Sequence, residues 1–160
     1  MSAHANVEMS GLGGSPAQGP GEFEQVYRAN VAAVTAYFAR RCAEPQTVAD
    51  LTSETFTRAV GSFRSFDVGK GTPRSWLFGI ATRIYADHCE QAAVGRDAVA
   101  RLAGHRALEV ERTAVELVDL TGLTSKEAAA ALGVTRGVLH ARLFRARARL
   151  RRGHEIDEHV

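Results

Sequence analysis

The chain has 160 residues, of which 45% are hydrophobic and 24% are charged, and its formal net charge is +2 at pH 7. This composition is typical of a globular protein with one ordinary domain or two small ones, and it argues against a disordered or fibrous chain. Charged residues or Gly interrupt the apolar runs well before the roughly 18–20 residues that a membrane span requires. The first residues also lack the basic start and apolar core of a secretory signal. We therefore expect a cytoplasmic protein without membrane contact.

The N-terminal part of the chain changes character at Glu22. Residues 1–21 are rich in Gly, Ser, Ala and Pro and bury too little apolar surface to fold, so we expect a mobile extension. Apolar residues then recur at intervals of three and four from Phe23 to Phe38, which predicts a helix with one buried stripe. That helix should end near Cys42, because the Pro at position 45 disfavours helical geometry in the residue before it.

Two further helices are expected in the first half of the chain. The first opens at Gln46 or Thr47 and stops at Gly61. A loop of residues 61–72 follows, with three Gly and two Phe. Thr72 and Pro73 then form a strong helix start, because Thr caps free amides and Pro is pre-shaped for the first helical position. This helix should run to about Gln91, and no segment predicts a β-strand.

The second half of the chain also has a helical pattern. Residues 92–106 have weak periodicity and are expected to form a linker with at most a short helix. A helix from Leu108 to Gly122 and two more helices should follow. The expected fold is all-α, with small helical domains at residues 22–91 and 107–152 and a tail at residues 153–160.

The last two helices carry the chemistry of a helix-turn-helix. Thr124 and Glu127 fit the capping box, in which each side chain satisfies a free amide at the helix start. Gly133 permits the left-handed turn between the helices, and Thr135 caps the second one. The second helix of such a unit can lie in the major groove of DNA.

This second helix is strongly basic, with no Asp or Glu between Ala128 and Gly153. On a helical wheel, Leu139, Leu143, Ala146 and Leu150 share the side that faces the first helix. The side chains predicted to contact DNA lie elsewhere on the wheel or at its start: Arg136, Gly137, His140, Ala141, Arg142 and Arg145. The competing interpretation, a solvated basic helix without a nucleic-acid partner, is weakened by the caps and the turn.

Neither cysteines nor histidines indicate a metal site or an enzyme. Cys42 and Cys89 form no C-x-x-C motif, which argues for two buried thiols. The six histidines match no zinc spacing, and the sequence contains no phosphate loop or nucleophile triad. We therefore expect no metal, no cofactor and no enzymatic activity.

Two stretches of the chain together resemble a known family. The segments "VADLTSETFTRAV" and "GSFRSFDVGKGTPRSWLFGIATRIYAD" are similar to the core domain of sigma factors of the extracytoplasmic-function (ECF) group. The segment "GLTSKEAAAALGVTRGVLHARLFRARARLR" resembles their promoter-reading region. The resemblance implies a sigma-2-like bundle and a sigma-4-like helix-turn-helix domain in a non-catalytic subunit that binds bacterial core RNA polymerase and promoter DNA. Family members are commonly held by an anti-sigma factor, which is a further candidate partner.

The resemblance also implies roles for individual residues. A polymerase-binding surface would comprise Asp50, Glu54, Thr55 and Arg58. The loop that captures melted promoter DNA and the helix after it would contribute Phe63, Arg64, Phe66, Lys70, Arg74 and Arg83. Phe63 and Phe66 fit a role in the core equally well, and Trp76 is interpreted as a buried anchor.

Several positions depart from the family pattern and keep alternatives open. Asp87 and Glu90 stand where the family has a basic run, and Ser53 replaces a common glutamine. A linker of about 15 residues spans at most roughly 50 Å, which is short for two domains that hold separated promoter elements. The first alternative is a sigma-like adaptor or decoy that binds an anti-sigma factor or another regulator without opening promoters. A helix-turn-helix repressor is the second.

Overall fold

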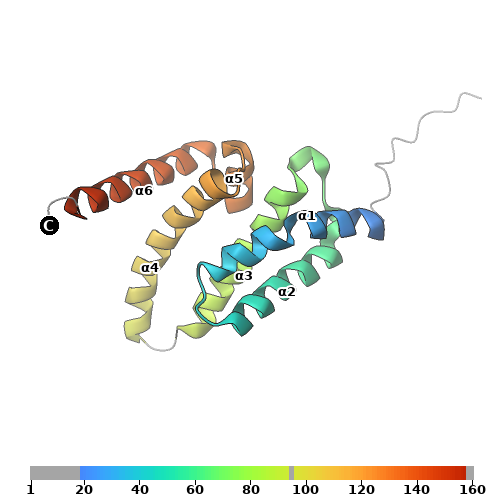
Figure 1. Cartoon of the computed structure of the whole chain (residues 1–160), viewed down its shortest axis with the longest axis horizontal. Coiled ribbons are helices and arrows are strands. Elements are labelled where there is room, and N and C mark those ends of the chain that lie inside the picture. Colours follow the sequence, from blue (N-terminus) through green and yellow to red (C-terminus); the bar gives the residue numbers. More distant parts are fainter. Residues whose placement is uncertain (1–18, 94–95, 158–160) are drawn as a thin grey trace, which may run out of the picture.

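The computed structural model describes residues 19–93 and 96–157, and it describes side chains for residues 19–93 and 104–152. All regular structure in these ranges is helical, which confirms the all-α class (Figure 1). The elements in chain order are α1 (Pro20–Ala39), α2 (Pro45–Ser62), η1 (Phe63–Ser65), η2 (Val68–Lys70), α3 (Pro73–Ala92), α4 (Arg96–Val115), η3 (Glu116–Leu120), α5 (Ser125–Leu132) and α6 (Arg136–Asp157). Among these helices, none has the length and hydropathy needed to cross a bilayer. The expected extension, up to residue 18, lies outside the described residues, as does the end of the tail.

The starts of the first three helices follow local chemistry. α1, α2 and α3 each have Pro in their first turn, where a missing N–H costs nothing. The Thr72 hydroxyl accepts a hydrogen bond from the N–H of Ser75 at 3.2 Å, as the predicted cap requires. The predicted stop of α2 at Gly61 was wrong, because the helix continues to Ser62. A single Gly inside a helix costs only about 1 kcal/mol, and packing against α1 and α3 overrides it.

The segment expected to be a linker is mostly helix. α4 begins at Arg96, so only residues 93–95 separate it from α3. The sequence did not predict this helix, because its first turns lack a regular apolar stripe. α4 then passes into η3, a π-helical turn in which the N–H of Thr121 bonds the carbonyl of Glu116 at 2.9 Å. Such a turn has an extra residue and rotates the side chains that follow.

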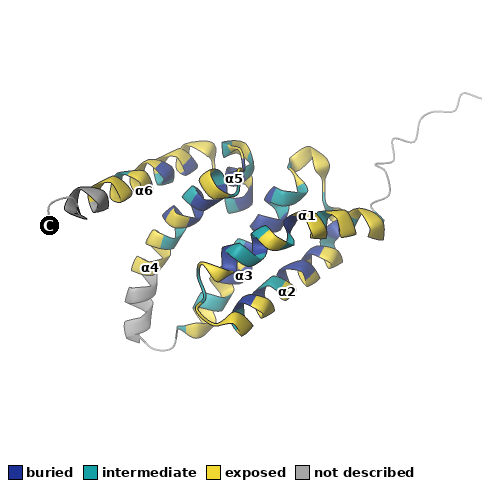
Figure 2. Cartoon of the chain, viewed as in Figure 1, coloured by how far each residue is buried: buried dark blue, intermediate teal, exposed yellow. Residues whose placement is uncertain are grey.

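The two halves of the chain pack against each other. The N-terminal half comprises α1, α2 and α3, and the C-terminal half comprises α4, η3, α5 and α6. Helix α3 contacts α5 directly, and α4 contacts α6 (Figure 1). One hydrophobic cluster runs through both halves, from Phe38 and Phe78 to Leu117 and Leu139. Figure 2 shows buried positions in the helices of both halves. In this arrangement the two predicted domains share a core.

Candidate protein and nucleic-acid interfaces

The outer face of α2 carries three of the four residues predicted to bind polymerase. Asp50, Glu54 and Arg58 are exposed and lie one turn apart, with Arg58 bonded to Glu54 at 2.5 Å. Arg58 also pairs with Asp87 of α3 at 3.6 Å. Thr55 is fully buried instead, and its hydroxyl donates to the carbonyl of Leu51 at 2.8 Å. A helix cannot present positions 54 and 55 on the same side, so Thr55 is not part of the exposed surface.

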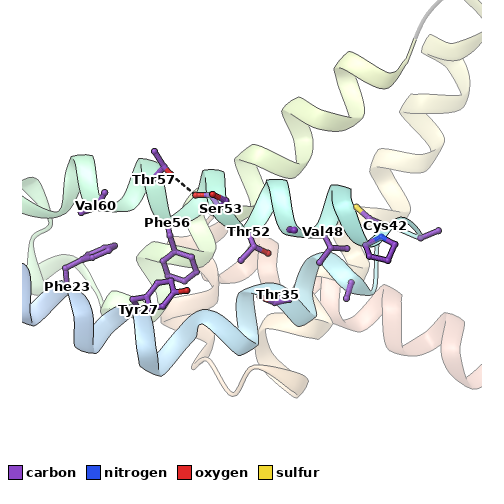
Figure 3. Close-up of a pocket in the computed structure, with 14 residues that line it drawn as sticks. Phe23, Tyr27, Thr35, Cys42, Val48, Thr52, Ser53, Phe56, Thr57 and Val60 are labelled. Carbon is purple, nitrogen blue, oxygen red and sulfur yellow. Dashed lines mark hydrogen bonds between the residues drawn. The ribbon is translucent and has the colours of Figure 1, made fainter.

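A groove between α1 and α2 adjoins this face. It has a volume of about 940 Å³ and an apolar lining, with Tyr27 and Phe56 edge to face at a centroid distance of 4.7 Å (Figure 3). Phe23 and Val60 line its other end. Tyr27, which falls in the stripe from Phe23 to Phe38 that was predicted to be buried, is exposed, and Val60 is exposed as well. The sequence could not reveal the groove, because a stripe at helical spacing predicts burial whether or not a neighbour covers it.

The loop of residues 61–72 is held by an aromatic cluster. Phe63 is buried, with its ring 5.2 Å from Phe23, 6.3 Å from Phe66 and 6.0 Å from Trp76. The ring of Phe66 lies 5.1 Å from Trp76 and is partly exposed. Two roles were left open for these phenylalanines, contact with melted DNA and packing in the core. Phe63 is a core residue, whereas Phe66 keeps one partly accessible face. The predicted role of Trp76 as an anchor agrees with these contacts.

The charged side chains around the loop fall into two groups. Arg64, Lys70 and Arg83 are exposed, and Lys70 lies 3.7 Å from Asp67. Arg74 is partly buried and turned towards α1, where it donates to Asn30 at 3.5 Å. Its guanidinium also lies 5.9 Å from the ring of Phe78. The position of Arg74 is therefore one of packing between helices, while the other three cations remain accessible to a ligand.

The helix-turn-helix forms as its capping residues predict. The Thr124 hydroxyl accepts from the N–H of Glu127 at 3.3 Å, and the Glu127 carboxylate accepts from the N–H of Thr124 at 2.9 Å. These bonds from Thr124 lower the pKa of Glu127. Gly133 has φ 64°, in the left-handed region that favours Gly. The Thr135 hydroxyl caps α6 by accepting from the N–H of Val138 at 3.3 Å.

The arginines of α6 divide into free and paired groups. Arg136, Gly137, His140 and Ala141 are exposed at the start of the helix, and Arg142 is partly exposed. Farther along, Arg145 donates to Glu111 of α4 at 3.0 Å, and Arg147 and Arg149 pair with Asp119 and Glu111. The structure thus commits Arg145 to a contact with α4.

One expectation about the buried side of α6 was wrong. Leu139, Leu143 and Ala146 are buried, but Leu150 is exposed. Leu150 lines an apolar hollow of about 350 Å³ together with Leu108 and Leu120. Residues of α4, η3 and α6 line this hollow, and Leu108 and Leu120 are exposed like Leu150.

Sequence reasoning missed a buried ionic cluster between the two halves. The side chain of Arg41 is 0% exposed, and its guanidinium lies 3.7 Å from the centroid of the Tyr37 ring. Its Nε donates to Glu109 at 2.6 Å, and its Nη1 donates to Glu116. Arg40 also pairs with Glu116. The acidic residues come from α4 and η3, roughly seventy positions along the chain, so no local pattern could have revealed the cluster.

The ionic cluster changes the titration of its members. Burial raises the pKa of Tyr37 to about 12. Burial alone would lower the pKa of Arg41, but its neighbours Tyr37, Glu116 and Glu109 raise it. Arg41 therefore stays charged although it is buried. Among the described residues, no group of three or more His, Cys, Asp or Glu is placed to hold a metal ion.

Comparisons with known proteins match both halves of the chain. The family model of Sigma-70 region 2 matches residues 26–94, and that of Sigma-70, region 4 matches residues 108–150. The chain is 32% identical over 133 residues to the probable RNA polymerase sigma-C factor of Mycobacterium bovis and to the ECF RNA polymerase sigma factor SigC of Mycobacterium tuberculosis. The match covers 68% of this chain and 71% of each relative.

Two solved structures have a similar fold. The sigma factor RpoE of Bartonella quintana, in complex with the anti-sigma factor NepR, aligns with a TM-score of 0.68 at 22% identity over 85% of this chain and 98% of that one. CnrH, in complex with the cytosolic domain of CnrY, aligns with a TM-score of 0.62 at 28% identity. That alignment covers 89% of this chain and 92% of CnrH.

Proposed function

Because this chain belongs to the ECF sigma factors of the sigma-70 family, we propose that it binds bacterial core RNA polymerase and directs it to promoters by contacting DNA. It would act in the cytoplasm as a subunit without enzymatic chemistry of its own. The observation that carries the proposal is the joint presence of both sigma regions in one chain, with sequence identity to a sigma factor that extends across both halves.

We assign polymerase binding to the exposed side chains of α2. Asp50, Glu54 and Arg58 present two negative charges and one positive charge on adjacent turns, a pattern that suits a charged helical partner. Thr55 supports this helix from inside without touching a partner.

We assign DNA contact to the start of α6 and to the loop of residues 61–72 with α3. Arg136, His140 and Arg142 follow the capped turn, where the helix N-terminus adds partial positive charge. The small residues between them let the helix approach base edges. Phe66, Lys70 and Arg83 offer an aromatic surface and positive charge to unpaired bases.

The alternative function is a sigma-like adaptor that binds a regulator and does not open promoters. The observation in its favour is the acidic end of α3, where Asp87 pairs with Arg58 and Glu90 pairs with Arg106. An anti-sigma factor is a proposed partner under either function, since RpoE and CnrH were both solved with another protein bound.

Transcription in vitro separates the two functions. Purified chain is added to core polymerase from its native cell, with genomic fragments as templates, and transcripts are mapped. A sigma factor yields discrete starts that depend on the added chain. An adaptor co-purifies with polymerase or a regulator but yields no such starts. The combined Asp50→Ala and Glu54→Ala change should weaken polymerase binding, whereas Thr57→Ala, on the groove side of α2, serves as the matched control. Unchanged polymerase binding in the double variant would contradict the α2 assignment.

A further inference from the structure

The first turn of α1 carries an aromatic residue that reaches the loop of residues 61–72. The ring of Phe23 meets the ring of Phe63 edge to face, with a centroid distance of 5.2 Å and an interplanar angle of 67°. Aromatic rings attract each other in this geometry, because the positive edge of one ring lies against the negative face of the other. Helix α1 therefore supports the loop through a residue that lies far from it in the sequence.

A series of ring contacts continues from Phe63 to the aromatic residue that we assign to unpaired bases. The rings of Phe63 and Phe66 are stacked, with an interplanar angle of 7° and a centroid distance of 6.3 Å. Trp76 of α3 lies 6.0 Å from Phe63 and 5.1 Å from Phe66. Phe63 is only 6% exposed, whereas Phe66 is the partly exposed end of the series. The orientation of the Phe66 ring therefore depends on Phe63, which Phe23 supports from the side of α1.

The backbone hydrogen bonds of the loop have a different effect from these ring contacts. The N–H groups of Phe66 and Lys70 donate to the carbonyl oxygens of Phe63 and Asp67, each at 3.0 Å. Because these bonds join residues three positions apart, they determine the shape of each turn but not where the turn lies against the helices. The ring contacts with α1 and α3 determine that position.

The surroundings of Phe23 favour a local role over general support of the fold. Phe23 is only partly buried, and with Tyr27 and Val60 it lines the open groove between α1 and α2 (Figure 3). A side chain in the first turn of a helix, with one side open to a groove, can be shortened without leaving an enclosed cavity. A change of Phe23 should therefore disturb the loop more than the core.

We propose that Phe23 is a positioning residue for melted promoter DNA, which holds the Phe66 ring through Phe63 in the orientation that stacks on an unpaired base. This inference rests on the proposed function. A side chain that is already ordered loses less freedom on binding, so its affinity for the base is higher. Loss of the Phe23 ring should therefore weaken the binding of unpaired bases, but not that of polymerase, whose assigned residues lie on the outer face of α2.

Variants of the full chain, each bound to core polymerase at saturating concentration, test the proposal. Phe23→Leu and Phe23→Met remove the ring but keep an apolar side chain, and Phe23→Tyr keeps the ring. Tyr27→Leu is the matched control, because Tyr27 lies one turn along α1 and forms its own edge-to-face pair with Phe56 at 4.7 Å, away from the loop. Phe66→Leu, alone and combined with Phe23→Leu, completes a double-mutant cycle. Fluorescence anisotropy measures the binding of a single-stranded oligonucleotide from a promoter that transcription in vitro has mapped.

Phe23→Leu and Phe23→Met should weaken oligonucleotide binding about three- to ten-fold, the range expected for the loss of one edge-to-face pair. Phe23→Tyr and Tyr27→Leu should bind the oligonucleotide like the unchanged chain. The double variant should lose no more affinity than Phe66→Leu alone, because Phe23 acts through the Phe66 ring.

Three results would overturn the proposal: equal oligonucleotide binding by Phe23→Leu and Tyr27→Leu, losses that add in the double variant, or a parallel loss of polymerase affinity in Phe23→Leu. The last result would assign Phe23 to general support of the fold. If the unchanged chain with polymerase starts no transcription and binds no oligonucleotide, the proposed function fails instead.

Discussion

Removing the charge of Glu116 should lower the free energy of unfolding by about 3 kcal/mol. In the Glu116→Gln variant the side chain keeps its size, but Arg41 loses one of two carboxylate partners while its own side chain remains 0% exposed. Removal of one partner from a buried ion pair costs about 3–5 kcal/mol, because the other charge loses its compensation. The lower end applies here, since Glu109 stays bonded to Arg41. The loss of the pair between Glu116 and Arg40 adds little to this cost, because the Arg40 side chain is 40% exposed and water can replace the carboxylate.

Urea unfolding measures this change through two signals. Circular dichroism follows the helices, and the fluorescence of Trp76, the only tryptophan in the chain, follows the contact between α3 and α5. In a chain of this size, about 3 kcal/mol corresponds to a fall in Tm of roughly 6–12 °C. Glu24→Gln is the matched control, because its pair with Arg28 is exposed and should contribute less than about 0.5 kcal/mol. A loss below about 1 kcal/mol for Glu116→Gln would show that Arg41 is compensated without this carboxylate, and the reasoning about the buried ionic cluster would fail.

Three other measurements test the charged residues. Arg142→Ala should weaken binding to duplex promoter DNA and reduce the slope of log affinity against log salt by about one. Arg147→Ala is the control, because Arg147 pairs with Asp119, and it should leave the slope unchanged. Equal slopes for the two variants, measured by fluorescence anisotropy, would contradict the assignment of Arg142 to a DNA phosphate. The pKa of Glu127 is lowered in the folded protein, so its contribution to stability is complete above its ordinary pKa of 4.5 and is lost as the pH falls through the pKa of the folded state. Glu127→Gln should therefore reduce the loss of unfolding free energy at acid pH. The pKa of Tyr37, raised from 10.0 to about 12 by burial, means that stability is complete below pH 10 and is lost as the pH rises through 12. Tyr37→Phe should therefore reduce the loss of unfolding free energy at alkaline pH, as measured by urea unfolding. If the loss is unchanged in this variant, groups other than Tyr37 cause it.

Local chemistry made much of the fold predictable. Thr72, Thr124 and Gly133 set the start or end of a helix through bonds that span only a few residues, and each predicted cap or turn is found in the structure. The pairing of a capped short helix with a capped long one also indicated the DNA-binding unit. These features depend only on a side chain and the backbone of the next few residues, so a single sequence is enough to predict them.

The remaining features depend on contacts between distant segments. Leu150 is exposed although its spacing places it on the same side of α6 as the buried Leu139 and Leu143. Arg41 and Glu116 are separated by 75 positions, and nothing in either neighbourhood indicates the other. The joint core of the two halves was unpredictable for the same reason, since each half has a complete apolar pattern of its own.

The arginine-rich end of the chain shows why charge alone misleads. The sequence has seven arginines from Arg136 to Arg152, and we predicted DNA contact for Arg136, Arg142 and Arg145 among them. In the structure Arg145 and Arg149 share Glu111 of α4, and Arg147 pairs with Asp119 of η3, so three guanidinium groups hold α6 against α4 and η3. Among the described side chains, Arg136 and Arg142 at the start of α6 have no acidic partner. Because the helix N-terminus adds positive potential there, phosphate binding should concentrate at this end of α6 even though most of the arginines lie at the other.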